Sequence, residues 1–257
     1  MSAAPSQPEN VSVEVRGLRK SFGSLEVLKG ISFKVNPGEI FVIMGPSGSG
    51  KSVLLRHIIG LETPDAGGIL IQGEPVGASD VRDKYRMAMV FQSAALLTSL
   101  SVGENVGLYL TEHFLKTPAE IAAIVASKLE AVGLPGLEDR APAELSGGMQ
   151  KRVAIARALV MEPQLFLFDE PTAELDPPMA VTIDEEILKL KNRTHATSII
   201  VTHDRTLAFS LADRVAMIFD GQILFIGTPD EVRQQADPRI HEFIHAKPPT
   251  SKSPLMS

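Results

Sequence analysis

The chain has 257 residues, a formal net charge of −6 at pH 7 and no cysteine. The lack of cysteine excludes disulfides and thiolate metal sites, and the acidic balance argues against a nucleic-acid binder that depends on a basic surface. No apolar stretch reaches the roughly 18 residues of a transmembrane helix, and residues 1–10 lack the basic and apolar regions of a signal peptide. We therefore expect a cytosolic protein with flexible tails at residues 1–10 and 247–257.

The first third of the chain predicts strands. Val11–Val15 alternates apolar and polar residues, as a half-buried strand does, and Leu25–Val35 follows up to a turn at residues 36–38. Glu39–Met44 is an apolar run of strand length, and it leads through a glycine-rich loop to a predicted helix over Val53–Gly60. Two further short strands are predicted at Gly67–Gly73 and Met87–Gln92.

The loop before this helix carries the most specific chemistry in the sequence. Residues 45–52 read GPSGSGKS and fit the phosphate-binding pattern G-x-x-x-x-G-K-[ST]. Its glycines allow turns that point successive backbone N–H groups at phosphate oxygens, while Lys51 reaches the β- and γ-phosphates and Ser52 offers a hydroxyl to Mg²⁺. The alternative is a chance glycine-rich turn, against which the flanking strand and helix argue. The residues predicted to contact a nucleotide here are Gly45, Pro46, Ser47, Gly48, Ser49, Gly50, Lys51 and Ser52.

The middle of the chain is predicted to be helical. A capping box at Thr117–Glu120, with proline at the first helical position, starts a helix that Gly133 ends. Its apolar residues share one face at helical spacing: Ile121, Ile124, Val125 and Leu129. We expect a helical subdomain over about residues 93–160, inserted into an α/β core.

The last third returns to strands and helices in alternation. Apolar strands at Leu165–Asp169 and Thr197–His203 flank a helix over Met179–Lys191, and their lack of polar alternation predicts a parallel sheet covered on both faces. A short final helix is predicted over Arg239–Ala246, packed either on its own core or on a neighbouring subunit.

Two acids end the strand Leu165–Asp169. A buried strand of this kind presents Asp169 and Glu170 at its carboxyl end, where ligands bind in open α/β sheets. We predict that Asp169 holds Mg²⁺, directly or through water, and that Glu170 accepts the proton of an attacking water. A solvated acidic turn is the alternative.

A second motif points to a family. Leu145–Gln150 reads LSGGMQ and leads into a helical run over Lys151–Val160, which sets Ser146, Gly147 and Gly148 at a helix N-terminus that favours phosphate. With these motifs, the chain resembles the ATP-binding subunits of ABC transporters over nearly its whole length. The resemblance implies a single α/β domain over residues 11–246 with the P-loop NTPase fold of ABC type: a RecA-like, mostly parallel sheet core, an antiparallel β subdomain and the helical subdomain. It also implies ATP hydrolysis coupled to transport.

The resemblance assigns roles to residues outside these motifs. Phe22 matches the aromatic residue that stacks on adenine, with packing against the first strand as the alternative. Gln92 matches the glutamine that reaches Mg²⁺ and the attacking water, and His203 matches the histidine that contacts the γ-phosphate. Asp176 matches the aspartate that links the two sites of a dimer, whereas Glu174 departs from the small residue common at its position. The implied magnesium ligands are Ser52, Gln92 and Asp169.

The same resemblance implies partner chains. In the family, the motif at residues 146–148 closes over the ATP of a second subunit, so a chain with one phosphate loop and one such motif needs a second copy or a paralogue. A membrane permease would dock at a groove that includes Ser93–His113, with Leu96, Leu97 and Leu100 as candidate contacts. For these leucines, the core of the helical subdomain is the alternative.

Several segments narrow the resemblance to the ATPases of lipid-trafficking importers associated with mammalian-cell-entry (MCE) proteins, including the bacterial system that maintains lipid asymmetry. These segments read FQSAAL, SVGENV, TEH, KLEAVGL and DPRIHEF, while Tyr109-Leu110 departs from the Pro-Leu common in that group. The resemblance implies phospholipid trafficking, an MCE-domain partner and a place on the cytoplasmic face of the inner membrane, reached through the permease. Two alternatives stay open: the ATPase of another ABC importer or exporter, and a non-transport ABC switch such as a cell-division regulator.

Overall fold

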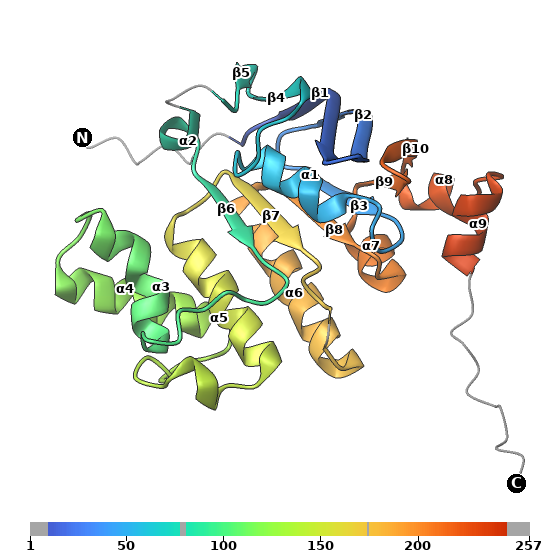
Figure 1. Cartoon of the computed structure of the whole chain (residues 1–257). Coiled ribbons are helices and arrows are strands. Elements are labelled where there is room, and N and C mark those ends of the chain that lie inside the picture. Colours follow the sequence, from blue (N-terminus) through green and yellow to red (C-terminus); the bar gives the residue numbers. More distant parts are fainter. Residues whose placement is uncertain (1–9, 78–80, 174, 246–257) are drawn as a thin grey trace, which may run out of the picture.

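The computed structural model describes residues 10–77, 81–173 and 175–245. The predicted flexible tails therefore lie outside the described residues, apart from Asn10, and so does Glu174. Within the described ranges the chain folds into two sheets and a set of helices (Figure 1).

The larger sheet has six strands in the order β10-β9-β3-β8-β7-β6. It is parallel except for β10, which runs antiparallel to β9. Its strands are β3 (Ile40–Met44), β6 (Met87–Val90), β7 (Leu165–Asp169), β8 (Thr197–Thr202), β9 (Arg214–Phe219) and β10 (Gln222–Gly227). The prediction of an α/β fold with a mostly parallel sheet is confirmed.

The smaller sheet has four antiparallel strands in the order β2-β1-β4-β5, so the expected antiparallel β part is present as well. Its strands are β1 (Val13–Phe22), β2 (Leu25–Val35), β4 (Ala66–Ile71) and β5 (Glu74–Pro75). In β1 the pairing register shifts between Val15 and Leu18, around Gly17 with its positive φ of 55°. This bulge breaks the alternation of apolar residues, which is why the sequence pattern predicts a strand only as far as Val15.

Helices cover both faces of the larger sheet and form a separate group at one side of it (Figure 1). They are α1 (Lys51–Ile58), α2 (Val81–Lys84), α3 (Val102–Glu112), α4 (Pro118–Ala131), α5 (Gly147–Val160), α6 (Pro177–Thr194), α7 (Arg205–Leu211), α8 (Pro229–Arg233) and α9 (Pro238–His245), with a 3₁₀ turn at Pro142–Glu144. The group at the side consists of α3 and α4 with α5, and α4 begins at the predicted capping box of Thr117 and Glu120.

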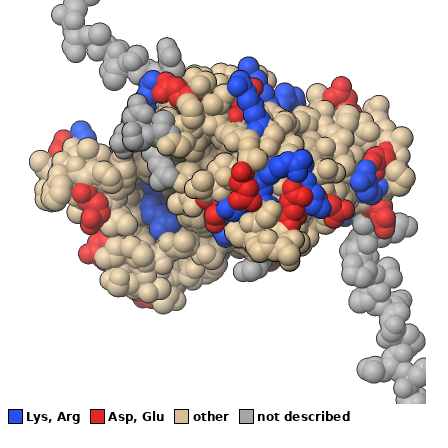
Figure 2. Space-filling model, turned by 45° about the horizontal axis from the view of Figure 1, so that its top comes forward, with Lys and Arg blue, Asp and Glu red and all other residues tan. Residues whose placement is uncertain are grey.

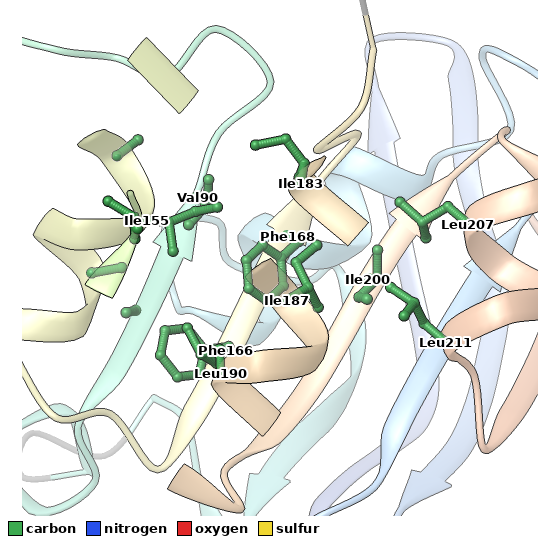
Figure 3. Packing of buried hydrophobic residues seen from close by; sticks show 14 of the residues in the cluster. Val90, Ile155, Phe166, Phe168, Ile183, Ile187, Leu190, Ile200, Leu207 and Leu211 are labelled. Carbon is green, nitrogen blue, oxygen red and sulfur yellow. The ribbon is translucent and has the colours of Figure 1, made fainter. Parts of the chain in front are cut away.

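Each parallel strand contributes to two apolar cores. In β7, Phe166 and Phe168 face the core formed with α5, α6 and α7, whereas Leu165 and Leu167 face the core formed with α1 and the smaller sheet. All four side chains are fully buried. Figure 3 shows the first core, in which Phe168 and Ile187 lie between β7 and α6. A strand buried on both faces cannot alternate with polar residues, which explains the unbroken apolar run LFLF.

Several element ends differ from the predicted ones. The strand that begins at Met87 ends at Val90, so Gln92 lies in the following turn and does not end a strand. The helix after the phosphate loop begins at Lys51, because the left-handed Gly50 (φ 97°) is its N-cap residue. No individual prediction corresponds to the helices α2, α3, α7 and α8 or to the strands β5, β9 and β10, although α3 lies within the segment expected to be helical.

The final helix packs on its own chain. Ile240 and Ile244 of α9 are buried in the first core, and the ring of Phe243 meets that of Phe219 edge to face at 5.9 Å. Of the two placements left open by the sequence, the structure therefore has the one on the chain's own core. No helix among the described residues has the length and apolar character needed to cross a membrane.

Candidate active site

Three of the predicted site segments meet at the carboxyl edge of the larger sheet. The phosphate loop follows β3, Asp169 ends β7, and His203 follows β8, which lies between β3 and β7. Because these strands run parallel, their carboxyl ends face the same way. The arrangement gathers in space residues that are far apart in sequence.

The phosphate loop depends on glycine for both space and backbone angle. A Cβ on Gly45 would lie 2.0 Å from the backbone oxygen of Ile218, so no larger residue fits without moving β9. Gly50 has a φ of 97°, and a Cβ there would lie 2.8 Å from a methyl group of Leu28. Gly48 has a φ of 82° and open space around its missing side chain. The loop therefore approaches neighbouring strands closely at its ends and stays open at its middle.

Lys51 is buried beneath this loop. Its Nζ donates to the backbone oxygens of Gly45, at 2.9 Å, and Pro46, at 3.1 Å, and lies 3.5 Å from Glu170 Oε1. Burial lowers the pKa of Lys51, and the negative charge of Glu170 opposes that shift. The ammonium group is thus held inside the curve of the loop, where a bound phosphate would be its partner.

Ser52 and Asp169 meet at the start of α1. The Ser52 hydroxyl donates to Asp169 Oδ1 at 2.7 Å. Burial raises the pKa of Asp169, and the hydrogen bond from Ser52 acts in the opposite direction. Both groups offer hard oxygen ligands of the kind that Mg²⁺ prefers.

The described residues contain no group of three or more acidic or imidazole side chains that could hold a metal ion unaided. One carboxylate with one hydroxyl suits Mg²⁺, which in proteins keeps several waters and takes other oxygens from substrate phosphates. The residues present at Ser52 and Asp169 therefore fit a magnesium ion that arrives with a nucleotide.

Glu170 connects Lys51 to His203. Its Oε2 lies 2.9 Å from His203 Nδ1 and accepts a hydrogen bond from the His203 backbone N–H at 3.2 Å. Glu170 has a φ of 47°, an uncommon conformation for a residue with a side chain, and its own N–H donates to the backbone oxygen of Val201. The backbone thus turns sharply after β7, and this turn holds a buried carboxylate beside an exposed imidazole.

Two predicted residues stand apart from this cluster. Gln92 is exposed in the turn after β6, and the described contacts do not join it to the cluster around Glu170. Phe22, at the end of β1, is 46% exposed and has the Lys20 ammonium 5.4 Å from its ring centroid. The ring is thus accessible at the surface beside Lys20, and its stacking on adenine stays a prediction.

The segments predicted to meet a second subunit lie next to each other. Ser146 caps α5 by accepting from the Met149 N–H, and Asp176 caps α6 by accepting from the Met179 N–H. The two helix starts touch, because a Cβ on Gly148 would lie 2.3 Å from the Met179 methyl group. Ser146 and Asp176 are both exposed, so they present one joint surface.

Sequence reasoning missed two cations of α5 that hold the loops of this site. The buried Lys151 Nζ donates to the backbone oxygens of Glu170 (3.2 Å), Pro171 (2.9 Å) and Ala173 (2.9 Å). Arg157 donates to the backbone oxygens of Ala94 and Ala95, the residues that follow the turn of Gln92. A signal for Lys151 was present, because it stands three, four and seven residues before apolar positions and so falls on the buried face of the helix.

A buried amide organises the segment in which a permease contact was predicted. Asn105 is fully buried, and its amide nitrogen donates to the backbone oxygens of Leu97, Leu100 and Ser101. Of the candidate contacts, Leu97 is 47% exposed, whereas Leu96 packs against the first core. Leu96 thus matches the core alternative, and Leu97 remains available at the surface.

Comparisons with known proteins agree with this geometry. A family model described as "ABC transporter" matches residues 28–173. The chain is 40% identical to "Protein TRIGALACTOSYLDIACYLGLYCEROL 3, chloroplastic" of Arabidopsis thaliana, over 91% of this chain and 73% of that protein. It is 43% identical to "Sulfate/thiosulfate import ATP-binding protein CysA" of Methylococcus capsulatus, over 91% of this chain and 68% of that protein. Its fold is similar to a solved dimeric post-hydrolysis state of an ATP-binding cassette bound to ADP and Pi, with a TM-score of 0.77 and 30% identity over 84% of this chain and 98% of that one.

Proposed function

Because the chain belongs to the ABC transporter family as an ATP-binding subunit, whose ATP hydrolysis is coupled to transport, we propose that it energises phospholipid trafficking through a membrane permease. The observation that carries the proposed catalytic assignment is the pair of contacts at the start of α1. Lys51 meets Glu170 and Ser52 meets Asp169 at one edge of the sheet. This is where a nucleotide triphosphate and its metal would lie.

In the proposed mechanism, the phosphate loop binds the triphosphate through its backbone N–H groups, and Lys51 exchanges its loop carbonyl partners for phosphate oxygens. Ser52 and Asp169 would hold Mg²⁺, with Gln92 as the predicted third ligand, and the ion would neutralise charge on the phosphates. Phe22 stacks on the adenine ring from the end of β1. These residues position the nucleotide, which is most of what phosphoryl transfer requires of a protein.

Glu170 is proposed to accept the proton of the attacking water, whose oxygen forms a bond to the γ-phosphorus as the bond to the ADP oxygen breaks. His203 would contact the γ-phosphate. Its contact with Glu170 Oε2 holds the two side chains next to each other. The other carboxylate oxygen of Glu170 faces Lys51, so binding of ATP must first separate this pair. A general base of this kind typically contributes about 10²- to 10⁴-fold in rate.

A second copy of the chain, or a paralogue, is proposed to complete each site. The exposed surface formed by Ser146, Gly147 and Asp176 would close over the ATP held by the partner, with Gly148 allowing the close approach of α6. The dimeric state of the similar solved cassette supports this arrangement. Closure with ATP and opening after hydrolysis would then drive the permease.

The lipid assignment is supported by similarity to a relative whose name contains a galactolipid and by the sequence resemblance to MCE-associated ATPases. On this proposal, the chain lies at the cytoplasmic face of the inner membrane, bound to a permease that works with an MCE-domain protein. Leu97 is the candidate permease contact that the fold leaves exposed. The 43% identity to a sulfate/thiosulfate import ATPase favours a second candidate, service to an importer of another substrate.

The test is affinity purification of the Glu170→Gln form from native membranes with ATP, with Glu185→Gln, an exposed acid on α6, as the matched control. Recovery of a permease, an MCE-domain protein and bound phospholipid with the first form is the expected result. A permease with a different substrate-binding protein would replace the lipid assignment with the second candidate. Recovery without any permease would overturn the transport role.

A further inference from the structure

A cavity of about 780 Å³ lies at the other edge of the larger sheet, away from the candidate active site. Its wall includes Arg86 and Gln164, the residues that immediately precede β6 and β7. At about 3.3 Å per residue, the length of β7 separates Gln164 from Asp169 by about 16 Å. The mechanism proposed above makes no use of this cavity.

The cavity combines an apolar floor with a basic rim. Ile155, Leu159 and Leu190 contribute to the floor. The acids in the wall are Glu162 and Glu186, against five basic residues, so the formal charge of the lining is +3, on a chain whose net charge is −6. The basic residues are Lys84, Arg86, Lys128, Lys189 and Arg193. Figure 2 shows basic side chains in a hollow at the left of the view.

Some of the basic residues of the cavity already form ion pairs with acidic side chains, and others do not. Lys84 pairs with Glu74, and Lys189 pairs with Glu186 at 2.9 Å. Among the described residues, ion pairs involve neither Lys128 nor Arg193. Arg193 also stands one helical turn after Lys189, where like charges repel. A bound anion would relieve this repulsion.

The negative C-terminal ends of nearby helices offset only part of this positive charge. The helices α4, α5 and α6 all end at the cavity, and Lys128 and Arg193 lie in the last turns of α4 and α6, where cations are favoured. Each helix C-terminus acts as about half a negative charge, so three of them offset about 1.5 of the three net positive charges. An excess of positive charge remains over an apolar floor.

We propose that this cavity binds a small organic anion that joins an apolar body to a phosphate or carboxylate group. The volume lies within the range of about 300–1,000 Å³ typical of small-molecule sites, which are also apolar with a few polar groups that fix orientation. Such a ligand would bury its apolar part against Leu159 and Leu190 and place its charge between Lys128 and Arg193. It would also bridge the helical group at the side of the molecule and α6 on the sheet.

Calorimetric titration of the full chain, with its nucleotide site saturated by ADP, tests the chemistry. Octyl phosphate carries both features, inorganic phosphate only the charge, and octyl glucoside only the chain. We expect octyl phosphate to bind with a dissociation constant of roughly 10⁻⁴ M and the other two probes at least about tenfold more weakly. Failure of octyl phosphate to bind, or equal binding of octyl glucoside, would overturn the proposal.

The location is tested with Lys128→Glu/Arg193→Glu, which should weaken octyl phosphate binding at least about tenfold. The matched control, Lys34→Glu/Lys116→Glu, makes the same change in charge at exposed positions outside the cavity and should bind normally. Circular dichroism and ATP hydrolysis verify that both variants are folded. Unchanged binding in the cavity variant, or an equal loss in the control, would remove the ligand from this cavity.

Two further probes distinguish the source of the ligand. Tighter binding of dihexanoyl phosphatidic acid than of phenyl phosphate would identify a lipid, and the reverse order would identify a free metabolite; either result supports the proposed chemistry. An acidic partner protein whose capture is lost in Lys128→Glu/Arg193→Glu, with no binding of the small probes, would overturn the proposal in favour of a protein interface.

Discussion

Replacing Lys151 by methionine removes a buried ammonium group and keeps a side chain of similar length. Lys151 reaches from α5 to three backbone oxygens of one loop, those of Glu170, Pro171 and Ala173, at 2.9–3.2 Å. These carbonyl groups belong to the loop that carries the proposed general base. The substitution therefore tests whether the helix that begins at Ser146 holds that loop in place.

The expected loss of stability follows from the number of bonds. A hydrogen bond from a charged donor contributes about 1.5–3 kcal/mol, but removing the lysine also removes the cost of burying its charge, which is several kcal/mol. We expect a net decrease of about 3 kcal/mol in the free energy of unfolding. Since domains are stable by about 5–15 kcal/mol, the variant should still fold.

The expected effect on catalysis is larger than the effect on binding. A displacement of a catalytic group by about 1 Å can cost on the order of 10²-fold in rate, so kcat should fall by about 10- to 100-fold. The phosphate loop is not touched by Lys151, and the dissociation constant for ATP should change less than about threefold.

Urea unfolding, steady-state ATP hydrolysis and equilibrium binding of a fluorescent ATP analogue measure the three quantities. Lys34→Met, at an exposed position of β2, is the control and should change stability by less than about 0.5 kcal/mol. Lys151→Arg, which keeps the charge, should lie between the wild type and methionine forms. A methionine form with normal kcat, or one whose ATP affinity falls in parallel with kcat, would refute the reasoning.

Three further predictions concern the site and its surroundings. Glu170→Gln should reduce ATP turnover by about 10²- to 10⁴-fold and leave ATP binding intact; unchanged turnover would remove Glu170 from the proposed role. Lys51→Ala should weaken ATP binding itself, measured by titration, and full affinity there would contradict the phosphate-loop assignment. Burial, with a smaller contribution from Asp204, raises the pKa of Asp184 to about 6, above its value in the unfolded chain. Ionising Asp184 in the folded protein therefore lowers the free energy of unfolding as the pH rises from about 4 to about 6. Asp184→Asn should therefore raise the free energy of unfolding at pH 8 by about 1–2 kcal/mol, discounted for partial exposure, with a gain that shrinks toward pH 4; an equal gain at both pH values would contradict this.

The elements that bear the proposed chemistry were the most predictable parts of the chain. Buried parallel strands read as unbroken apolar runs, and loops that must approach other backbone closely require glycine, as Gly45 does beneath Ile218. Both requirements act on a few neighbouring residues and therefore leave a clear pattern in the sequence. The ends of β3 and β7, and hence the meeting of the phosphate loop with Asp169 and Glu170, could therefore be placed from sequence.

Other features depend on contacts that no local pattern encodes. β10 contains the apolar run Ile223–Ile226, yet it is only half-buried and pairs with β9 alone, so the run does not reveal the strand's antiparallel place at the edge of the sheet. Helical spacing places Lys151 on the buried face of α5, but its acceptors are carbonyl groups about 20 residues later, and no local pattern identifies them. The basic cavity assembles Lys84, Lys128 and Arg193 from three helices, and their proximity exists only in the folded chain.

Two cations of α5 connect that helix to two separate loops of the candidate site. Lys151 ties it to the loop of Glu170, and Arg157, six residues or about 9 Å further along the axis, ties it to the loop after Gln92. If α5 moves as a rigid body, it cannot tilt without shifting both loops, so we expect a displacement of the proposed permease-facing loop to reach the proposed general base Glu170 without crossing the sheet. In hydrogen exchange, residues 93–95 and 170–173 should accordingly open as one cooperative unit.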